Sequence, residues 1–214
     1  MNQRGAILVA LFLAMALMAW RNDRAAMGNK GRLAVEIEGR TAILHWAAPI
    51  EAPMARRIAE VYSEVGGDVD EFIVGLDSPG GSVAQGRAVI AILHDIKSTH
   101  RLVTYVDDAA DCLSMCVPVY LAGTRRIAGP TARFMFHEPT TRDSLTGDRV
   151  KRPRFESRWA TARFVEKYFQ RSEMDPAWRK SLTSTWSGRD VWKSGAELVD
   201  ERAGVVTDLS GGPL

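Results

Sequence analysis

The spacing of apolar residues predicts a chain in which strands alternate with helices. Short runs of continuous or alternating apolar residues indicate strands, and apolar side chains three and four residues apart indicate helices. In the first half of the chain, the predicted elements are strands at 33–38, 42–46, 72–76 and 102–106, a helix at 53–65, and a second helix that carries Val89, Ile90, Leu93 and Ile96 on one face. Strand, glycine turn, helix and strand in this order form a βαβ unit, which predicts parallel strands covered by helices.

The second half of the chain is expected to contain more helix. Pro118 predicts a short helix that begins near Ser114 and ends at Gly123, because proline lacks an N–H and is tolerated only in the first helical turn. A strand is expected to end at His137. After a polar segment at 140–154, the predicted elements are helices at 155–170, 175–183 and 194–201 and a small closing strand at 205–206. The whole pattern is that of an α/β domain built from stacked βαβ units.

Residues 5–20 form an uncharged apolar run that lies apart from this pattern. The run is short for a membrane-spanning helix and close in length to a signal-peptide core, so we expect a signal peptide or a membrane anchor at 1–20. Residues 21–32 are then a polar linker, and the domain covers 33–210. This organisation predicts a periplasmic or otherwise extracytoplasmic protein, anchored to the inner membrane if the run is retained. An anchored protein of this kind would place its domain outside the cytoplasm. Positively charged residues next to a membrane segment tend to stay in the cytoplasm, so the cations that follow the run argue against this orientation: Arg21, Arg24, Lys30 and Arg32.

Composition and charge narrow the class of protein. A length of 214 residues suits one domain with a buried core, and a formal net charge of +2 gives no electrostatic case for a nucleic-acid partner. The sequence contains neither a basic stripe interleaved with aromatic residues nor an internal repeat. We therefore expect a single globular domain that binds no nucleic acid.

Ser114 and His137 are the first candidates for chemistry. A serine at the start of a helix lies among unpaired N–H groups, at the positive end of the helix dipole, where a developing oxyanion is stabilised. Serine and aspartate are also common N-caps, so Ser114 or Asp111 can equally close a helix. His137 can likewise be a hydrogen-bonded structural histidine at the end of a strand.

The turn after the strand at 72–76 has the sequence DSPGGSV and contains Gly80-Gly81. Paired glycines let the backbone approach a ligand closely and direct its N–H groups at an anion. The alternative is a tight turn between a strand and a helix. No Gly-Lys-Ser/Thr follows, and the spacing is not GxGxxG, which excludes the two common nucleotide-binding loops. The turn therefore favours a pair of backbone donors suited to a carbonyl oxygen.

Together these segments resemble the proteolytic subunit of the Clp protease and its relatives. The similar stretches are LDSPGGSV, Ser114-Met115, LAGTRRIAGPTARFMFHEP and GRDVWKS, and they cover 72–139 and 189–206. The segment CLSMC at 112–116 is more similar to exported Clp-like proteins than to the cytosolic subunit. Two departures from the cytosolic pattern are Cys116 in place of a glycine and one extra residue before the segment LAG. The resemblance implies a Clp protease/crotonase-like fold of stacked βαβ units.

The resemblance also implies a serine peptidase that hydrolyses peptide bonds through an acyl-enzyme. By position, Ser114 is the nucleophile, His137 the general base and Asp190 the residue that orients the histidine. The backbone N–H groups of Gly81 and Met115 form the oxyanion hole. Such chemistry needs no cofactor, and its partner is a peptide or protein substrate. The polar segment after the strand matches a family region that mediates contact between subunits, which implies a homo-oligomer. Residues 5–20 would supply any contact with a membrane.

The two cysteines allow two interpretations. Cys112 and Cys116 are one helical turn apart, so in a continuous helix they would share a face. In an exported protein an even cysteine count favours a disulfide, and this bridge would enclose Ser114 in a small loop. The alternative is two buried thiols that fill core space. Two cysteines alone make a poor metal site, so no metal is expected.

Asp190 and the function itself also have alternatives. Asp190 is consistent with a loop or N-cap aspartate. Three aspartates near the serine in sequence could orient His137 in its place: Asp107, Asp108 and Asp111. A catalytically inactive Clp-like binding or scaffold protein is the alternative function, favoured by Cys116 and by the ambiguity of Asp190. Crotonase-like acyl-CoA chemistry is a third, because it would use the same two backbone donors without a serine nucleophile.

Overall fold

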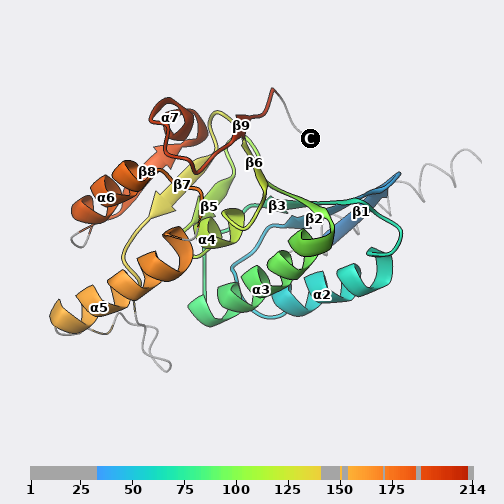
Figure 1. The fold of residues 1–214 in the computed structure, drawn as a ribbon, viewed down its shortest axis with the longest axis horizontal. Helices are drawn as coiled ribbons and strands as arrows, with labels where there is room; N and C mark the ends of the chain where they lie inside the picture. Colours follow the sequence, from blue (N-terminus) through green and yellow to red (C-terminus); the bar gives the residue numbers. More distant parts are fainter. Residues whose placement is uncertain (1–32, 141–149, 151–153, 171, 187–188, 212–214) are drawn as a thin grey trace, which may run out of the picture.

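The computed structural model describes residues 33–140, 150, 154–170, 172–186 and 189–211. The predicted apolar run at 5–20, the linker at 21–32 and most of the polar segment at 140–154 lie outside these residues. Within the described part of the chain, no helix is both long enough and apolar enough to cross a membrane. The described residues form two β-sheets with helices packed against them (Figure 1).

The larger sheet has six strands. In chain order and in spatial order they are β1 (Ala34–Glu38), β2 (Thr41–Trp46), β3 (Glu71–Leu76), β4 (Arg101–Val106), β6 (Arg125–Ala128) and β9 (Asp208–Leu209). β1 and β2 are antiparallel and joined by the turn at Gly39, whereas every later pair is parallel. The first four strands confirm the prediction from the apolar runs.

Two long helices cover one face of this sheet (Figure 1). They are α2 (Met54–Val65) and α3 (Val83–Thr99), and both confirm the predicted helices. Each turns one apolar stripe toward the strands, because residues three and four apart share a helical face. The fully buried side chains of these stripes are Met54, Ile58, Val89, Leu93 and Ile96.

A second sheet of three strands adjoins the carboxyl end of β3. It consists of β5 (Asp111–Leu113), β7 (Arg133–Phe136) and β8 (Val191–Ser194), with β7 in the centre, parallel to β5 and antiparallel to β8. Ser78, just past β3, joins the sheets: its N–H donates to the Asp111 carbonyl at 2.6 Å, and its carbonyl accepts from the Leu113 N–H at 3.0 Å. We call this backbone connection between Ser78 and β5 the sheet seam.

The remaining helices lie around the second sheet. They are α4 (Cys116–Tyr120), α5 (Arg154–Phe164) with the π-helical turn η1 (Val165–Phe169), α6 (Pro176–Thr185) and α7 (Gly195–Asp200). Phe169 anchors η1, since its ring centroid is 6.4 Å from that of Phe136 and 5.8 Å from that of Trp186. The start of α5 projects from the body of the molecule (Figure 1), and its Phe155 and Trp159 are 72% and 64% exposed.

Some expectations about elements are wrong. The short helix expected near Ser114 is present as α4, but it ends at Tyr120 and not at Gly123. It begins two residues after Ser114, at Cys116, because the left-handed backbone of Ser114 cannot be part of a right-handed helix. The closing strand expected at 205–206 is β9, three residues later, where the chain pairs with β6. Strands β5, β6 and β8, of three or four residues each, are not predicted from the apolar pattern. The helices expected at 155–170, 175–183 and 194–201 are confirmed with small changes in their bounds.

Candidate active site

A cavity at the junction of the two sheets contains the residues that the sequence singles out. It has a volume of about 780 Å³, and Gly81, Ser114, His137 and Asp190 contribute to its wall. A smaller cavity of about 50 Å³ shares three of these residues and adds Met115. The fold therefore brings four separate segments of the chain to one place.

Ser114 lies in the turn between β5 and α4 with φ at +54°. A left-handed backbone costs about 1–2 kcal/mol in a residue with a side chain, and strain of this kind concentrates at functional sites. Two hydrogen bonds hold the turn: the Ser114 N–H donates to the Met135 carbonyl at 2.8 Å, and the Ser114 carbonyl accepts from the Val117 N–H at 3.1 Å. The N-cap of α4 is Met115, so the interpretation of Ser114 as a helix cap is wrong.

His137 follows β7 and contacts the serine. Its Nε2 lies 2.6 Å from Ser114 Oγ. In the tautomer with a proton on Nδ1, Nε2 accepts a hydrogen bond from the hydroxyl and can take its proton. The preceding residue, Phe136, is buried and fixes the end of the strand. His137 thus has the geometry of a general base for Ser114.

Asp190 lies just before β8, and His137 lies just after β7, the strand that pairs with β8. The last paired residues of these antiparallel strands are Phe136 and Val191, so His137 and Asp190 are the next residues beyond the paired positions. The N-cap of α7 is Ser194, so Asp190 does not cap that helix. Asp190 is an exposed residue outside the helices and strands, as the alternative of a loop aspartate also predicts. Asp190 and His137 both contribute to the wall of the cavity of about 780 Å³.

The three aspartates that compete for the orienting role are engaged elsewhere, and none of them lines the cavity of about 780 Å³. Hydrogen bonds from the backbone and side chain of Thr131 lower the pKa of Asp108 below its usual value. The partners are the Tyr105 hydroxyl for Asp107 at 2.9 Å, the Thr131 hydroxyl for Asp108 at 2.8 Å and the Arg133 guanidinium for Asp111 at 2.7 Å.

Two backbone N–H groups at the smaller cavity have no acceptor among the described residues. They belong to Gly81 and Met115, the pair that the sequence predicts as the oxyanion hole. Gly80 permits the close approach of the two segments, since it has φ at +89° and a Cβ there would lie 2.5 Å from the Leu113 carbonyl oxygen and 2.8 Å from Ser114 Cβ. The glycine turn can therefore reach the serine only without a side chain at position 80.

A disulfide joins Cys112 to Cys116, and Ser114 lies midway in the loop that it closes. Both cysteines are fully buried. They do not share one helical face, as a continuous helix would require, because Cys112 belongs to β5 and Cys116 begins α4. The bridge instead ties together the two ends of the turn that carries Ser114 and Met115.

Comparison with known protein families decides the class of this domain. The family model for Clp protease matches residues 39–159, which is more than half of the chain. The chain belongs to the Clp protease family. By sequence, no curated protein matches it.

Solved structures share the fold of this Clp protease domain. A mutant of ClpP1 from Listeria monocytogenes is similar with a TM-score of 0.59 and 17% identity, over 80% of this chain and 91% of that one. A mutant of the membrane-bound stomatin-specific protease 1510-N is similar with a TM-score of 0.65 and 14% identity, over 82% of this chain and 81% of that one. The α/β Clp protease-like fold expected from the sequence is therefore confirmed.

Some residues of the Clp protease domain contact or line the candidate site although no sequence motif contains them. Ile50 fixes the glycine turn from outside, because its N–H donates to the Gly80 carbonyl at 2.7 Å and its carbonyl accepts from the Ser82 N–H at 3.0 Å. Glu51 and Thr140 contribute to the wall of the larger cavity. None of these residues belongs to a motif, so only the tertiary contacts identify them.

Proposed function

We propose that this member of the Clp protease family is a serine peptidase that hydrolyses peptide bonds, with Ser114, His137 and Asp190 as its triad. The observation that carries the proposal is the 2.6 Å separation between Ser114 Oγ and His137 Nε2, beside two N–H groups that have no acceptor among the described residues. A serine hydroxyl is a poor nucleophile until a neighbouring base takes its proton. The imidazole supplies that base.

In the proposed reaction, Ser114 Oγ attacks the carbonyl carbon of the scissile peptide bond while His137 Nε2 takes the hydroxyl proton. The N–H groups of Gly81 and Met115 stabilise the oxyanion, and one such donor typically contributes about 3 kcal/mol. His137 returns the proton to the leaving amine as the C–N bond breaks, which leaves an acyl group on Ser114. Water, deprotonated by the same imidazole, then releases the carboxylic acid and restores the serine. Asp190 would hold the Nδ1–H tautomer throughout.

A fluorophosphonate probe, which reacts with an activated serine, tests this proposal. We expect the probe to label the wild-type protein and not Ser114→Ala, with circular dichroism to show that both are folded. Peptide hydrolysis should fall by at least about a thousandfold in the same variant. A folded wild-type protein that takes up no probe would favour a catalytically inactive Clp-like binding or scaffold protein. Thioester turnover that survives Ser114→Ala would favour acyl-CoA chemistry.

The role of Asp190 needs its own variant. Asp190→Asn should keep the fold and lower kcat toward the roughly ten-thousandfold loss expected when a triad carboxylate is removed. Asp200→Asn, at the exposed end of α7, is the matched control and should leave kcat unchanged. Equal kcat in wild type and Asp190→Asn would remove Asp190 from the proposed triad.

We also propose that the domain works outside the cytoplasm and associates with copies of itself. The Cys112–Cys116 disulfide supports an oxidising compartment. The exposed Phe155 and Trp159 on α5 support a contact between copies. Mass spectrometry of the protein from cells checks the first point: a chain that starts after the apolar run fits a cleaved signal peptide, and an intact chain fits an anchor. Free thiols at both cysteines in freshly isolated protein would contradict export.

A further inference from the structure

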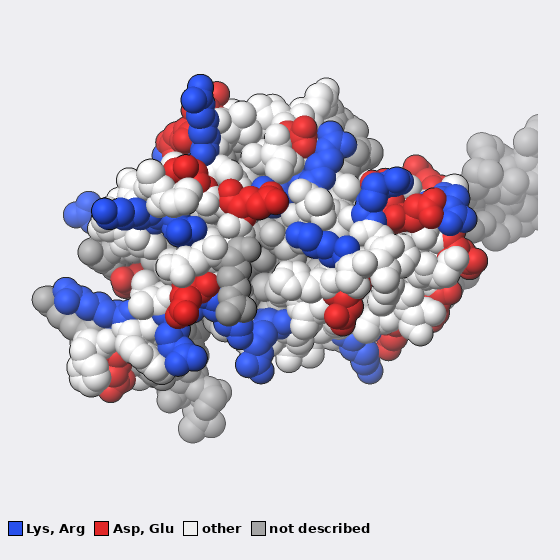
Figure 2. All heavy atoms as spheres, viewed as in Figure 1, with Lys and Arg blue, Asp and Glu red and all other residues white. Residues whose placement is uncertain are grey.

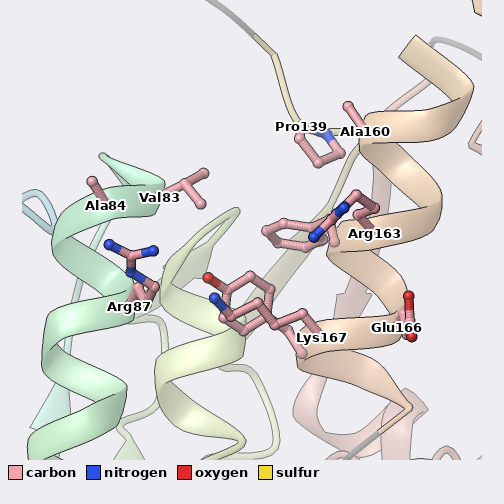
Figure 3. Close-up of a pocket in the computed structure, with 10 residues that line it drawn as sticks. Val83, Ala84, Arg87, Pro139, Ala160, Arg163, Glu166 and Lys167 are labelled. Carbon is pink, nitrogen blue, oxygen red and sulfur yellow. The ribbon is translucent and has the colours of Figure 1, made fainter. Parts of the chain in front are cut away.

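A second hollow, of about 720 Å³, opens beside the proposed active site (Figure 3). It lies between the start of α3 and the helix formed by α5 and η1. Its apolar lining includes Val83, Pro139 and Phe164, and these three residues also line the small cavity that Ser114 lines. We call this hollow, with the cations Arg87, Arg163 and Lys167 in its wall, the basic groove. Because the two cavities share their apolar residues, a peptide at Ser114 would extend into the groove.

The cations of the basic groove come from both of its walls. Arg87 follows Val83 by one helical turn on α3, and Arg163 and Lys167 are four residues apart on the facing helix. Figure 3 shows Lys167 extended across the gap toward Arg87, and Arg163 on the side of its helix that faces α3. Three like charges that face one common space attract an anion into it.

No carboxylate neutralises these cations within the described part of the chain. Other arginines of the domain are paired, such as Arg125 with Asp208 at 2.9 Å and Arg133 with Asp111 at 2.7 Å. Among the described residues, Arg87, Arg163 and Lys167 form no ion pair. Glu166 also contributes to the wall of the hollow, but Figure 3 shows its side chain on the side of the helix away from α3. The first turn of α3 contains no acidic residue, so its helix dipole adds to the positive potential.

Aromatic rings hold two of the cations in place. The Arg163 guanidinium lies 4.9 Å from the centroid of the Trp159 ring, and Lys167 Nζ lies 5.5 Å from that of Tyr168. Arg87 and Tyr168 both line the groove. Burial raises the pKa of Tyr168, and the charge of Arg87 opposes this shift. The Tyr168 hydroxyl is therefore neutral at physiological pH and can donate a hydrogen bond to an acidic ligand.

The cavity of about 780 Å³, which Ser114 lines, has the opposite charge. Glu51 and Asp190 contribute to its wall, and no lysine or arginine does so among the described residues. An acidic side chain on a bound peptide would be repelled there and attracted to the basic groove. The charge difference between the cavity and the basic groove thus favours one placement of such a peptide.

We propose, on the basis of the peptidase function proposed above, that the basic groove binds an aspartate or glutamate side chain of the substrate close to the scissile bond. The shared apolar residues would contact the neighbouring part of the peptide. Arg87, Arg163 and Lys167 would then determine specificity without taking part in bond breaking.

Binding to the full-length Ser114→Ala protein tests the inference independently of catalysis. The probes are short fluorescent peptides with blocked ends that differ only in glutamate or glutamine at one position, which is scanned along the peptide. Fluorescence anisotropy should show about fivefold tighter binding of glutamate at its best position, as expected for an exposed ion pair. Added salt should reduce this preference. Equal affinity for glutamate and glutamine at every position would overturn the inference.

Substitutions assign the preference to the groove. The combined variant Arg87→Gln, Arg163→Gln and Lys167→Gln should bind the two peptides equally. Arg158→Gln is the matched control, because Arg158 lies on the same helix outside the groove and should leave the preference intact. A glutamate preference that survives the triple variant would also overturn the inference.

Fluorophosphonate labelling of the wild type and of the triple variant separates this inference from the proposed function. Both proteins should be labelled at Ser114 to the same extent, because a neutral probe does not need the cations. Labelling without a glutamate preference would support the proposed peptidase function and contradict the inference that the groove binds an acidic side chain. A glutamate preference without labelling would remove the peptidase and support the groove as an acidic-peptide site of an inactive protein.

Discussion

Gly80 and Ser114 both have left-handed backbones, and they face each other beside the sheet seam. This conformation is ordinary for glycine but uncommon for serine, and the two turns meet where the proposed oxyanion hole adjoins the proposed nucleophile. Strained backbone persists only when its surroundings fix it. Here the hydrogen bonds of Ser78 on one side and the disulfide on the other fix both turns.

At the residue scale, Gly80→Ala should destabilise the protein and abolish labelling of Ser114. The new Cβ would contact the Leu113 carbonyl oxygen and Ser114 Cβ, in a backbone conformation that alanine disfavours. We expect a loss of about 1–3 kcal/mol in the free energy of unfolding by urea titration. Gly67→Ala is the control, because a Cβ there meets nothing within 4 Å, and its effect should stay within about 0.5 kcal/mol. Normal labelling of Gly80→Ala would contradict the close approach of the two turns.

The disulfide predicts a dependence of activity on the redox state. Removal of a bridge that closes so short a loop should lower the free energy of unfolding by about 2 kcal/mol, by the chain-entropy relation. The larger effect should be on function, because Ser114 and Met115 both lie inside the loop. We expect slower fluorophosphonate labelling both in the Cys112→Ala and Cys116→Ala double variant and in reduced wild-type protein. An unchanged labelling rate in protein whose thiols are shown to be free would contradict this role.

At the scale of elements, the sequence predicts those that have their own apolar pattern. The strands from β1 to β4 and the helices α2 and α3 are each long enough to show a period, so their residues alone indicate them. Strands β5 and β8 exist because they pair with β7, and no short segment reveals its partner. The candidate site divides in the same way. Motifs in the sequence single out Ser114, His137 and the glycine turn, whereas the place of Asp190 in the same cavity wall depends on the pairing of β8 with β7.

The projecting helix α5 yields a prediction about assembly. Phe155 and Trp159 are one helical turn apart and largely exposed, which is unfavourable unless another surface covers them. We expect Phe155→Ser with Trp159→Ser to reduce the mass of the particle in sedimentation experiments. Trp192→Ser is the control, because Trp192 is also exposed, at 51%, but lies on β8. A wild-type protein that sediments as a monomer at all concentrations would exclude association through α5.

At the scale of the whole molecule, charges are interspersed rather than gathered. On the face in Figure 2, the Lys, Arg, Asp and Glu residues that are described alternate across the surface. Ion pairs also link distant parts of the chain, and Arg125 on β6 with Asp208 on β9 joins the last strand to the sheet at 2.9 Å. Hydrogen bonds from Arg125 and Thr207 lower the pKa of Asp208 below its ordinary value.

The lowered pKa of Asp208 gives a prediction for acid stability. The carboxylate form stabilises the folded chain at pH above the ordinary aspartate pKa of about 4, and this contribution is lost as the pH falls through the lower pKa of the folded state. Asp208→Asn should therefore destabilise the protein at neutral pH and not in strong acid. The loss should be about 0.5 kcal/mol, because both partners are largely exposed. Urea unfolding at several pH values measures it, with Glu36→Gln on β1 as the control, and an equal loss at all pH values would contradict the linkage.

The sheet seam affects how this domain loses its activity on heating or in denaturant. The N–H of Gly81 follows a strand of the larger sheet, whereas the N–H of Met115 follows a strand of the smaller one. Partial opening of a protein costs less free energy than its complete unfolding. A slight parting of the two layers would separate these donors while each layer kept its own strands and helices. Mild heat or dilute denaturant should consequently inactivate the protein before its far-ultraviolet spectrum changes.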